Sequence, residues 1–489
     1  MAKKKAEGQV FTPLYLVCDI LNVAGYKGKN ILKKQIIDNS CGDGAFLCEI
    51  VRRYIDAYQG DNGDLSHLKE ELETYIHGIE LDPIAFHSCL SNLSKISNDA
   101  GIPHVKWDIL NADTLTVTQF NEKMDFVVGN PPYVRVHNLE SKYSQVKHFQ
   151  FAKKGMTDLY LVFFEIGFRM LNDKGKLCYI TPSSWLNSIA GDVLRKYIRQ
   201  TKSLETLVDL EHAQAFEATT YTIISLFSKK HRNNGFLYAI YDIESHIIKY
   251  LDEINYDDAF IDGNIYLASI EKLKELKGIL EYKHQTYAVV KNGFATLNDK
   301  VFIRKNFPFT NMLIDVVKAS SGEWKKALYP YDENGVQLPI NTIKEDKQVW
   351  NYLTENKPTL VKDNSIKDGA WYLYGRTQAL KDVSKHKYAI NTILKDIDSI
   401  KLIPVPKGMG VYSGLYILTH IKASVLRSII ISKDFLNYIR ALKKYKSGGY
   451  YTFSSKELQQ YLNYKINKLI ASDNNGHEPE IFESNHFLF

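Results

Sequence analysis

Residues 124–129 read Met-Asp-Phe-Val-Val-Gly and continue directly into Asn130-Pro131-Pro132-Tyr133. The first six residues are mainly apolar and end in glycine, so they predict a strand that closes at a turn. The next four combine an amide side chain, two prolines that stiffen the backbone, and an aromatic ring. Asn-Pro and Pro-Pro pairs also occur in ordinary turns, so the tetrapeptide alone allows a purely structural interpretation.

The tetrapeptide has the groups needed to methylate the exocyclic amine of a flat base. The lone pair of that amine is delocalised into the ring, which makes the nitrogen a poor nucleophile. Two acceptors that take both N–H hydrogens would localise the lone pair, and the Asn130 Oδ1 and the Pro131 carbonyl are suited to this role. Tyr133 could hold the base by stacking on its face. The candidate catalytic residues are therefore Asn130, Pro131, Pro132 and Tyr133.

The length and composition of the chain bound the kind of protein that it forms. A chain of 489 residues predicts two domains. No apolar run approaches the length of a membrane span, and the start Met-Ala-Lys-Lys-Lys lacks the apolar segment of a signal peptide, so we expect a cytoplasmic protein that does not enter a membrane. Five cysteines without a CxxC pair favour reduced thiols over a disulfide framework or a metal site, and we expect no metal.

Charge and aromatic content give a weaker indication of the partner. The formal net charge of +6 is mild, and many proteins without a polyanionic partner carry as much. The chain has 32 Tyr and 23 Phe, with lysines interleaved through the C-terminal half. Such a surface can pair with phosphates and stack on bases. The same composition also arises from an AT-rich genome, and both interpretations remain open.

The N-terminal half predicts a sheet that alternates with helices. Residues 36–38 form a short apolar strand, residues 39–44 a tight glycine-containing loop, and a helix begins at Ala45 and runs to about residue 58. Strand, glycine loop and helix in this order are typical of nucleotide-binding crossovers. A second strand, residues 75–79, ends in Glu80, and the polar stretch 59–66 reads as an inserted loop before it.

Two further strands complete the pattern. A third strand around residues 104–106 leads to Asp108, and the fourth delivers Asn130. Four consecutive strands would then present Asp38, Glu80, Asp108 and Asn130 at their carboxyl ends, which form the ligand crevice of an open parallel sheet. Each acid separately is more often a helix cap or a turn former, but four in register favour a binding site. Further strands at 176–180, 207–210 and 221–228 would end the sheet in an antiparallel hairpin.

In motif content and order, the chain resembles the amino-group DNA methyltransferases that make N6-methyladenine, in the gamma arrangement of the TaqI enzyme and its Eco57I-like relatives. The resemblance is close over about residues 8–230. It rests on Phe11-Thr12-Pro13, on residues 38–44, on residues 130–133, and on later segments at 157–160, 180–186 and 215–217. The loop departs from the commoner acid-Pro-Ala/Ser-Cys-Gly pattern because Asn39 replaces the proline.

The resemblance implies S-adenosylmethionine as the cofactor and assigns roles to particular residues. Glu80 corresponds to the acid that binds the ribose, and Asp108 to the acid near the cofactor adenine. Phe216 corresponds to a second aromatic residue that, with Tyr133, holds the target adenine. The implied cofactor-binding residues are Thr12, Pro13, Asp38, Ser40, Cys41, Gly42, Gly44, Glu80, Leu81, Asp108, Ile109 and Asn130.

The C-terminal half resembles the target-recognition half of the same proteins less closely. Residues 291–302 resemble a Gly-x-x-Thr-x-x-Asn-x-x-Phe segment, and residues 371–376 and 447–454 resemble other parts of that domain. The implied DNA-binding residues are Asn298, Lys300 and Arg376, although these stretches also fit simple packing roles. The predicted fold is α/β, with a doubly wound Rossmann-like sheet over residues 1–235 and a mixed α+β target-recognition domain over residues 236–489.

The activity implied by the resemblance is site-specific transfer of a methyl group from S-adenosylmethionine to N6 of a flipped-out adenine in duplex DNA. The setting would be a restriction-modification system of a bacterial or archaeal cell, with a cognate endonuclease encoded nearby and the chain acting as a monomer. A methyltransferase for RNA adenine or for a protein glutamine amide is the alternative. A bifunctional restriction enzyme and a catalytically silent DNA-binding subunit are further rivals, and the sequence offers no nuclease motif for the former.

Overall fold

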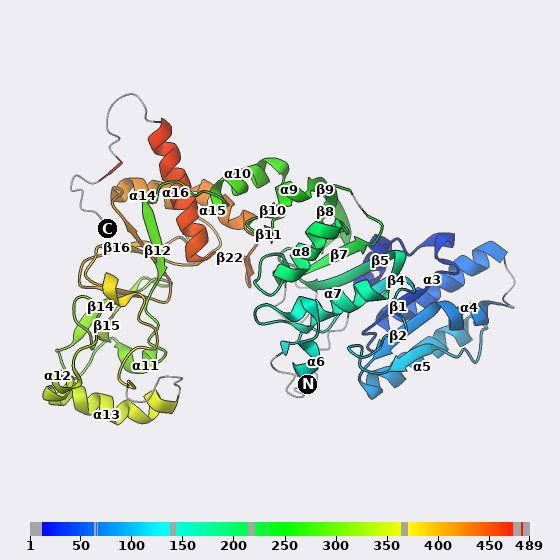
Figure 1. Cartoon of the computed structure of the whole chain (residues 1–489), viewed down its shortest axis with the longest axis horizontal. Coiled ribbons are helices and arrows are strands. Elements are labelled where there is room, and N and C mark those ends of the chain that lie inside the picture. Colours follow the sequence, from blue (N-terminus) through cyan, green and yellow to red (C-terminus); the bar gives the residue numbers. More distant parts are fainter. Residues whose placement is uncertain are drawn as a thin grey trace. The chain divides into compact units, whose positions relative to one another are not determined.

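The computed structural model describes residues 12–62, 65, 67–136, 143–213, 221–231, 233–362, 370–472 and 481–482. The chain forms two compact units, Met1–Lys274 and Glu275–Phe489, whose elements are labelled in Figure 1. The first unit extends past residue 235, because β8 (Gly235–Asp242) pairs in parallel with β6 (Leu204–Asp209). The functional assignment of residues 1–235 and 236–489 stays a prediction.

Nine strands of the first unit form one sheet: β1 (Ile36–Asp38), β2 (Ile76–Glu80), β3 (Asp108–Asn111), β4 (Met124–Gly129), β5 (Leu171–Pro182), β6, β7 (Thr222–Ser228), β8 and β9 (Ile247–Asn255). Their order is β3-β2-β1-β4-β5-β7-β6-β8-β9. The first five run parallel, and β7 lies antiparallel to both β5 and β6. The predicted α/β class and doubly wound sheet are confirmed, including the antiparallel strands after β5.

Helices connect the parallel strands except between β3 and β4, which are joined by turns (Figure 1). The helices of this unit are α2 (Leu14–Ala24), α3 (Ala45–Asn62), α4 (Leu68–Tyr75), α5 (Pro83–Asp99), α6 (Tyr143–Val146), α7 (Leu159–Met170), α8 (Asp192–Thr201) and α9 (Tyr256–Ala259), with the 3-10 turns η1 (Gly28–Ile31), η3 (Gln150–Ala152) and η4 (Ser183–Leu186) and the small hairpin β10 (Phe260–Ile261) and β11 (Asn264–Ile265). Helix α10 (Ile270–Leu280) spans the boundary between the two units. The loop expected at 59–66 is wrong in part, because α3 continues to Asn62. Ile50, Tyr54 and Tyr58 recur at helical spacing and are buried, which keeps this stretch helical.

The third strand lies later in the sequence than predicted. β3 spans Asp108–Asn111, whereas the sequence suggested a strand at 104–106. His104 has a φ of 59°, which a strand cannot contain. The buried residue of this strand is Ile109, and Asn111 pairs with Glu80 at the end of β2. The carboxyl end of β3 is therefore Asn111.

The sheet order reverses between β1 and β4, and this places two predicted site segments side by side. Asp38, the last residue of β1, pairs with Val128 of β4. The chain leaves β4 at Gly129, so Asn130 follows directly beside the end of β1. In an open parallel sheet, ligands bind outside the carboxyl ends of the strands at such a reversal.

The second unit combines helices with three small sheets, as predicted for a mixed α+β fold. Its strands are β12 (Ala288–Asn292), β13 (Ile303–Arg304), β14 (Leu313–Lys318), β15 (Glu323–Leu328), β16 (Lys387–Ile390), β17 (Ile393–Leu394), β18 (Leu402–Val405), β19 (Gly410–Tyr412), β20 (Leu415–Thr419), β21 (Tyr445–Lys446) and β22 (Tyr450–Thr452). Its helices are α11 (Asp299–Phe302), α12 (Ile340–Glu345), α13 (Lys347–Lys362), α14 (Ala423–Ile430), α15 (Lys433–Ala441) and α16 (Ser455–Ser472), with the 3-10 turn η5 (Leu380–Asp382). The sheets have the orders β12-β20-β16-β18, β13-β15-β14-β19 and β17-β22-β21.

Several tyrosines of the second unit belong to its core. Tyr329, Tyr352 and Tyr374 are buried, and their hydroxyls donate to the carbonyls of Leu380, Val301 and Leu328 at 3.1, 2.7 and 2.7 Å. A buried phenol needs such a partner, because an unsatisfied hydroxyl costs free energy. Part of the high tyrosine content is therefore structural. Among the described residues, no helix is both long and apolar enough to cross a membrane.

Candidate functional site

The loop after β1 is held by the carboxylates at the ends of two strands. Asp38 is buried, and its Oδ1 accepts from the Ser40 N–H at 3.0 Å. Glu80 Oε2 accepts from the Gly42 N–H at 2.8 Å. Gly44 has a φ of 92°, a conformation that favours glycine, and a side chain there would meet the Cys89 sulfur. The glycines therefore allow the chain to turn sharply from β1 into α3.

Asp38 is in an environment that suits a positively charged ligand. Burial raises the pKa of this carboxyl from 3.8 to about 7; the Ser40 N–H opposes the rise and the nearby Glu80 adds to it. A Cβ at Gly129 would lie 2.7 Å from Asp38 Oδ1, so the absence of a side chain at 129 lets β4 approach the carboxylate. A bound cation would favour the ionised form of Asp38 and restore a low pKa.

Glu80 connects the two turns at the carboxyl ends of β1 and β2. Its Oε1 accepts from the Asp82 N–H at 2.8 Å, while Oε2 binds Gly42. Each carboxylate oxygen has a second lone pair, so Glu80 can still accept from a ligand hydroxyl. The next residue, Leu81, is 54% exposed, which leaves an apolar side chain beside this carboxylate.

Asp108 does not lie where the sequence predicted. It is the first residue of β3, next to His77 rather than next to Glu80. Its Oδ2 lies 2.6 Å from the His77 Nδ1, and the His77 Nε2 contacts the Gln35 Oε1. Asp108 thus lies at the amino end of β3, one residue before the level of Asp38 and three before that of Glu80. Its expected place at a carboxyl strand end is wrong, and Ile109 is buried within the strand.

The acid that follows β3 is Asp113, which the sequence reasoning missed. The Ala112 N–H donates to the Glu80 carbonyl at 3.0 Å, so the chain after β3 runs beside the end of β2. Asp113 is half-buried there, and its Oδ1 accepts from the Leu115 N–H at 3.2 Å. Placing the strand on the Asp-Ile-Leu-Asn stretch, in which the apolar pair is central, would have pointed to Asp113.

The tetrapeptide after β4 is fixed by contacts at both of its ends. The Asn130 Nδ2 donates to the Thr12 Oγ1 at 3.1 Å, which brings the residues before α2 to the candidate catalytic amide. The Tyr133 hydroxyl donates to the Ile180 carbonyl at 3.2 Å, and its ring meets the Tyr160 ring edge-on with centroids 6.3 Å apart. Burial raises the pKa of Tyr133, and the nearby Tyr160 adds to the rise, so this phenol stays neutral.

Asn39, the departure from the usual loop pattern, is completely buried and well bonded. Its Oδ1 accepts from the Tyr179 hydroxyl at 2.9 Å, and its carbonyl accepts from the Thr114 hydroxyl at 2.6 Å. Where the usual pattern has a rigid proline, the Asn39 side chain adds a hydrogen bond to β5, while its backbone carbonyl binds the turn after β3. Neither partner can be recognised from local sequence, because they lie 140 and 75 residues away.

The remaining predicted cofactor-binding and base-stacking residues are partly described by the structure. Thr12 and Cys41 are buried, and the Cys41 N–H donates to the Ile79 carbonyl at 3.0 Å. The Pro13 carbonyl accepts from the first N–H groups of α2. Phe11 and Phe216 lie outside the described residues.

The predicted DNA-binding residues differ in exposure. Lys300 and Arg376 are exposed. Asn298 is buried, and its Nδ2 donates to the Thr359 carbonyl at 3.4 Å. Its N–H is bound by the Thr296 hydroxyl at 3.1 Å, and its carbonyl accepts from the Val301 N–H at the start of α11. This position gives Asn298 a structural role and argues against a base contact.

Comparison with known proteins gives consistent matches. Residues 46–216 match the model of the Eco57I restriction-modification methylase family. The chain is 25% identical over an alignment of 537 residues to the Type II restriction enzyme and methyltransferase RM.Eco57I of Escherichia coli, covering 87% of this chain and 53% of that protein. It is 30% identical over 254 residues to the Type II methyltransferase M.BstVI of Geobacillus stearothermophilus, covering 48% of this chain and 45% of that protein.

A solved structure extends the likeness of fold to nearly the whole chain. The Type IIL restriction-modification enzyme MmeI, determined in complex with DNA, has a TM-score of 0.60 and 14% identity, and the match covers 96% of this chain and 70% of that one. The chain spans about half the length of the curated relatives it matches. The sheet and the matched segment agree: residues 46–216 of this chain are similar to the methylase domain of the Eco57I restriction-modification family.

Proposed function

We propose that this chain transfers a methyl group from S-adenosylmethionine to N6 of an adenine in duplex DNA. The observation that carries the proposal is the position of Asn130 beside Asp38 at the reversal of the sheet, where Gly129 lets the two strand ends approach. At that place the Asn130 amide can accept from an amine while the buried Asp38 carboxylate binds a cationic cofactor. The Eco57I-like domain supports the same reaction class.

The residues after β1 and β2 fit S-adenosylmethionine. The cofactor carries a sulfonium and an ammonium group, and the Asp38 carboxylate would be stabilised by this positive charge. The Ser40 Oγ is buried and has no partner among the described residues, so it can bind a polar group of a ligand. Glu80 can accept from ribose hydroxyls, and Asp113, which follows β3 beside the end of β2, would take the role near the cofactor adenine that the resemblance gives to Asp108.

When bound, the cofactor supplies an electrophilic methyl group, and the chain's own residues prepare the amine. Asn130 is oriented by Thr12: with its Nδ2 donating to the Thr12 hydroxyl, Oδ1 is the acceptor end of the amide. The Pro131 carbonyl is the second acceptor. Together they would take both N6 hydrogens and localise the nitrogen lone pair. Alignment of the amine with the methyl carbon and sulfur would supply much of the rate.

Tyr133 would hold the base against its ring. Its hydroxyl is fixed on the Ile180 carbonyl, so the ring orientation is set before a base arrives. An amine inside a duplex cannot reach this position, so the adenine would leave the stack. The proposal includes Phe216 as a second aromatic residue that contacts the base. It also includes a companion restriction endonuclease and action of the chain as a monomer.

The test is methyl transfer from labelled S-adenosylmethionine to duplex DNA, single-stranded DNA, RNA and protein, followed by mass spectrometry of the released nucleosides. We expect N6-methyladenine from duplex DNA. Asn130→Ala should lower turnover by at least a hundredfold with little change in cofactor affinity, while Asn311→Ala, which alters an amide on the surface of the second unit, should leave both unchanged. Transfer to protein or RNA alone, methylated cytosine, or full turnover by Asn130→Ala would refute the proposal.

A further inference from the structure

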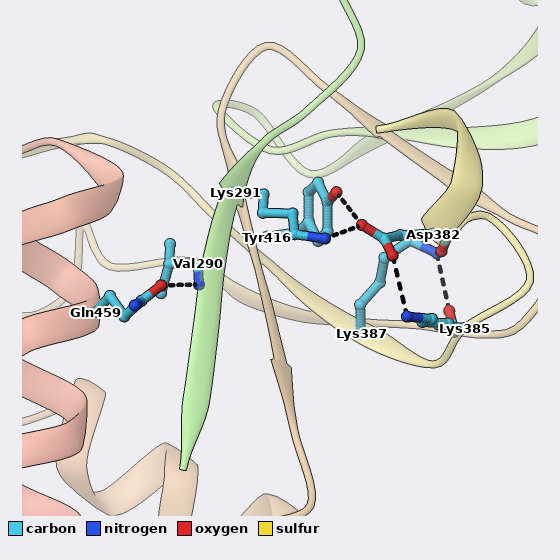
Figure 2. Close-up of polar contacts among 7 residues, drawn as sticks. All are labelled: Val290, Lys291, Asp382, Lys385, Lys387, Tyr416 and Gln459. Carbon is cyan, nitrogen blue, oxygen red and sulfur yellow. Dashed lines mark hydrogen bonds and ion pairs between the residues drawn. The ribbon is translucent and has the colours of Figure 1, made fainter. Parts of the chain in front are cut away.

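A compact group of charged residues in the second unit has no part in the site described above (Figure 2). Asp382, at the end of η5, is fully buried, and its Oδ2 accepts from the Lys291 Nζ at 2.6 Å and from the Tyr416 hydroxyl at 2.8 Å. The Lys385 Nζ lies 3.3 Å from its Oδ1. Two lysines thus bind different oxygens of one carboxylate.

Both lysines are held in place by the fold. Lys291 lies on β12 opposite Tyr416 of β20, and on the other edge of β12 the Val290 N–H donates to the Gln459 Oε1 at 2.9 Å (Figure 2). The turn that carries Lys385 is closed by Lys387. The Nζ of this buried lysine donates to the carbonyls of Asp382, Lys385 and Val383 at 2.7, 2.9 and 3.4 Å.

The cluster has an excess of positive charge at the surface. The partly exposed ammonium groups of Lys291 and Lys385 pair with one carboxylate that is buried beneath them. The ammonium of Lys387 is itself buried on backbone carbonyls. Burial lowers the pKa of Lys387 to about 8, opposed by Asp382, so this lysine is still mainly protonated at pH 7. The Lys291 and Lys385 side chains are 32% and 48% exposed. Each ammonium has three donors and uses one on Asp382, which leaves donors for a ligand oxygen.

We propose that Lys291 and Lys385 of the Glu275–Phe489 unit, which are positioned by Asp382, form a contact site for a backbone phosphate of DNA. A phosphodiester offers two anionic oxygens, which match two ammonium groups held close together. Because the ammoniums are already oriented by a buried acid, less side-chain entropy is lost on binding than at free lysines. This inference rests on the proposed function, which requires that the chain binds DNA.

The experiment measures the affinity of the full chain for a fluorescent DNA duplex at several salt concentrations. Each neutralised phosphate contributes a slope of about −0.9 in log affinity against log salt. The triple variant Asp382→Asn/Lys291→Gln/Lys385→Gln removes both contact lysines together with their shared carboxylate and leaves Lys387 bonded to its backbone carbonyls. Its slope should be shallower by about 0.9, which corresponds to about eightfold weaker binding at 0.1 M salt and about fourfold at 0.2 M.

Two further variants guard against misfolding and against a general charge effect. Lys385→Gln leaves Asp382 bonded to Lys291 and Tyr416, so it should fold normally, judged by its circular dichroism and thermal midpoint, and still bind at least twofold more weakly at 0.1 M salt. Lys305→Gln removes an exposed lysine that is also paired with an acid, Glu323, and should change neither slope nor affinity.

The outcomes separate this site from the proposed function. Wild-type slope and affinity in folded Lys385→Gln, or an equal loss in Lys305→Gln, would overturn the phosphate site. If the wild-type chain neither binds the duplex nor methylates it, the proposed function itself fails. If the wild-type chain methylates DNA while Lys385→Gln binds it as tightly as wild type, only the phosphate site is lost.

Discussion

The affinity for S-adenosylmethionine should depend on the ionisation of Asp38. Burial, opposed by the Ser40 N–H and strengthened by Glu80, raises the pKa of this carboxyl from 3.8 to about 7 before the cofactor binds. The cationic cofactor prefers the ionised form, so binding must displace a proton below pH 7. If only ionised Asp38 binds, the affinity at pH 6 is about fivefold lower than at pH 7, and at pH 5.5 about 16-fold lower.

The sign of this effect separates it from a loss of folding. A raised carboxyl pKa means that the folded chain binds the Asp38 proton more tightly than the unfolded chain, so this residue disfavours folding as the pH rises from 3.8 towards 7. Acidification to pH 5.5 therefore weakens the cofactor complex without loss of stability from Asp38. The cofactor's own amino group stays protonated in this window, because α-amino groups titrate near a pH of about 7.8.

The assay is isothermal titration calorimetry with S-adenosylmethionine at pH 5.5, 6.0, 6.5 and 7.0, in two buffers of different ionisation enthalpy. About 0.9 proton should be released per cofactor bound at pH 6. Asp108→Asn, two strands from Asp38 and bonded to His77, serves as the control and should keep the pH dependence, whereas Asp38→Asn should lose it. Affinity that is flat from pH 7 to 5.5 in the folded wild-type chain would refute the reasoning.

Three further predictions concern residues that hold the site together. Asp108→Asn should lower the free energy of unfolding by about 1–2 kcal/mol, because the hydrogen bond of the buried His77 loses its charged acceptor, with cofactor affinity within twofold of wild type in calorimetry. Tyr179→Phe should cost about 1 kcal/mol in denaturant unfolding, since the Asn39 amide loses its donor; unchanged stability would contradict this. Thr12→Val should lower kcat several-fold at constant cofactor Kd, because Asn130 loses its orienting contact; wild-type kcat would exclude that role.

The strands with clear local signals were predicted from the sequence, and the weakest one was misplaced. β1 and β4 end at glycine-containing turns that are visible in the sequence. β3 has only four residues, of which Ile109 alone is fully buried, so its periodicity does not distinguish it from the preceding Val105–Trp107 stretch. The error moved the expected acid from Asp113, which follows the carboxyl end of β3, to Asp108 at the amino end of the same short strand.

Contacts between distant segments could not be predicted for a different reason. Hydrophobic periodicity reports which face of an element is buried, but it does not report the partner. The hydrogen bond between Tyr179 and Asn39, and the grouping of Lys291 with Asp382, depend on how strands far apart in the chain are paired. Composition was also ambiguous, because a buried tyrosine bonded to a carbonyl contributes to the tyrosine count in the same way as an exposed one.

The glycine before the tetrapeptide lets the two strand ends that carry Asp38 and Asn130 approach each other. Asp38 and Asn130 come from neighbouring parallel strands, and the reversal of the sheet opens the space above them. Any side chain at Gly129 would enter the space of the Asp38 carboxylate, since its Cβ would lie 2.7 Å from Oδ1. The chain can therefore bring an amide acceptor to a buried acid only if residue 129 has no side chain. Under the proposed reaction, this single position sets how closely the amine approaches the methyl donor.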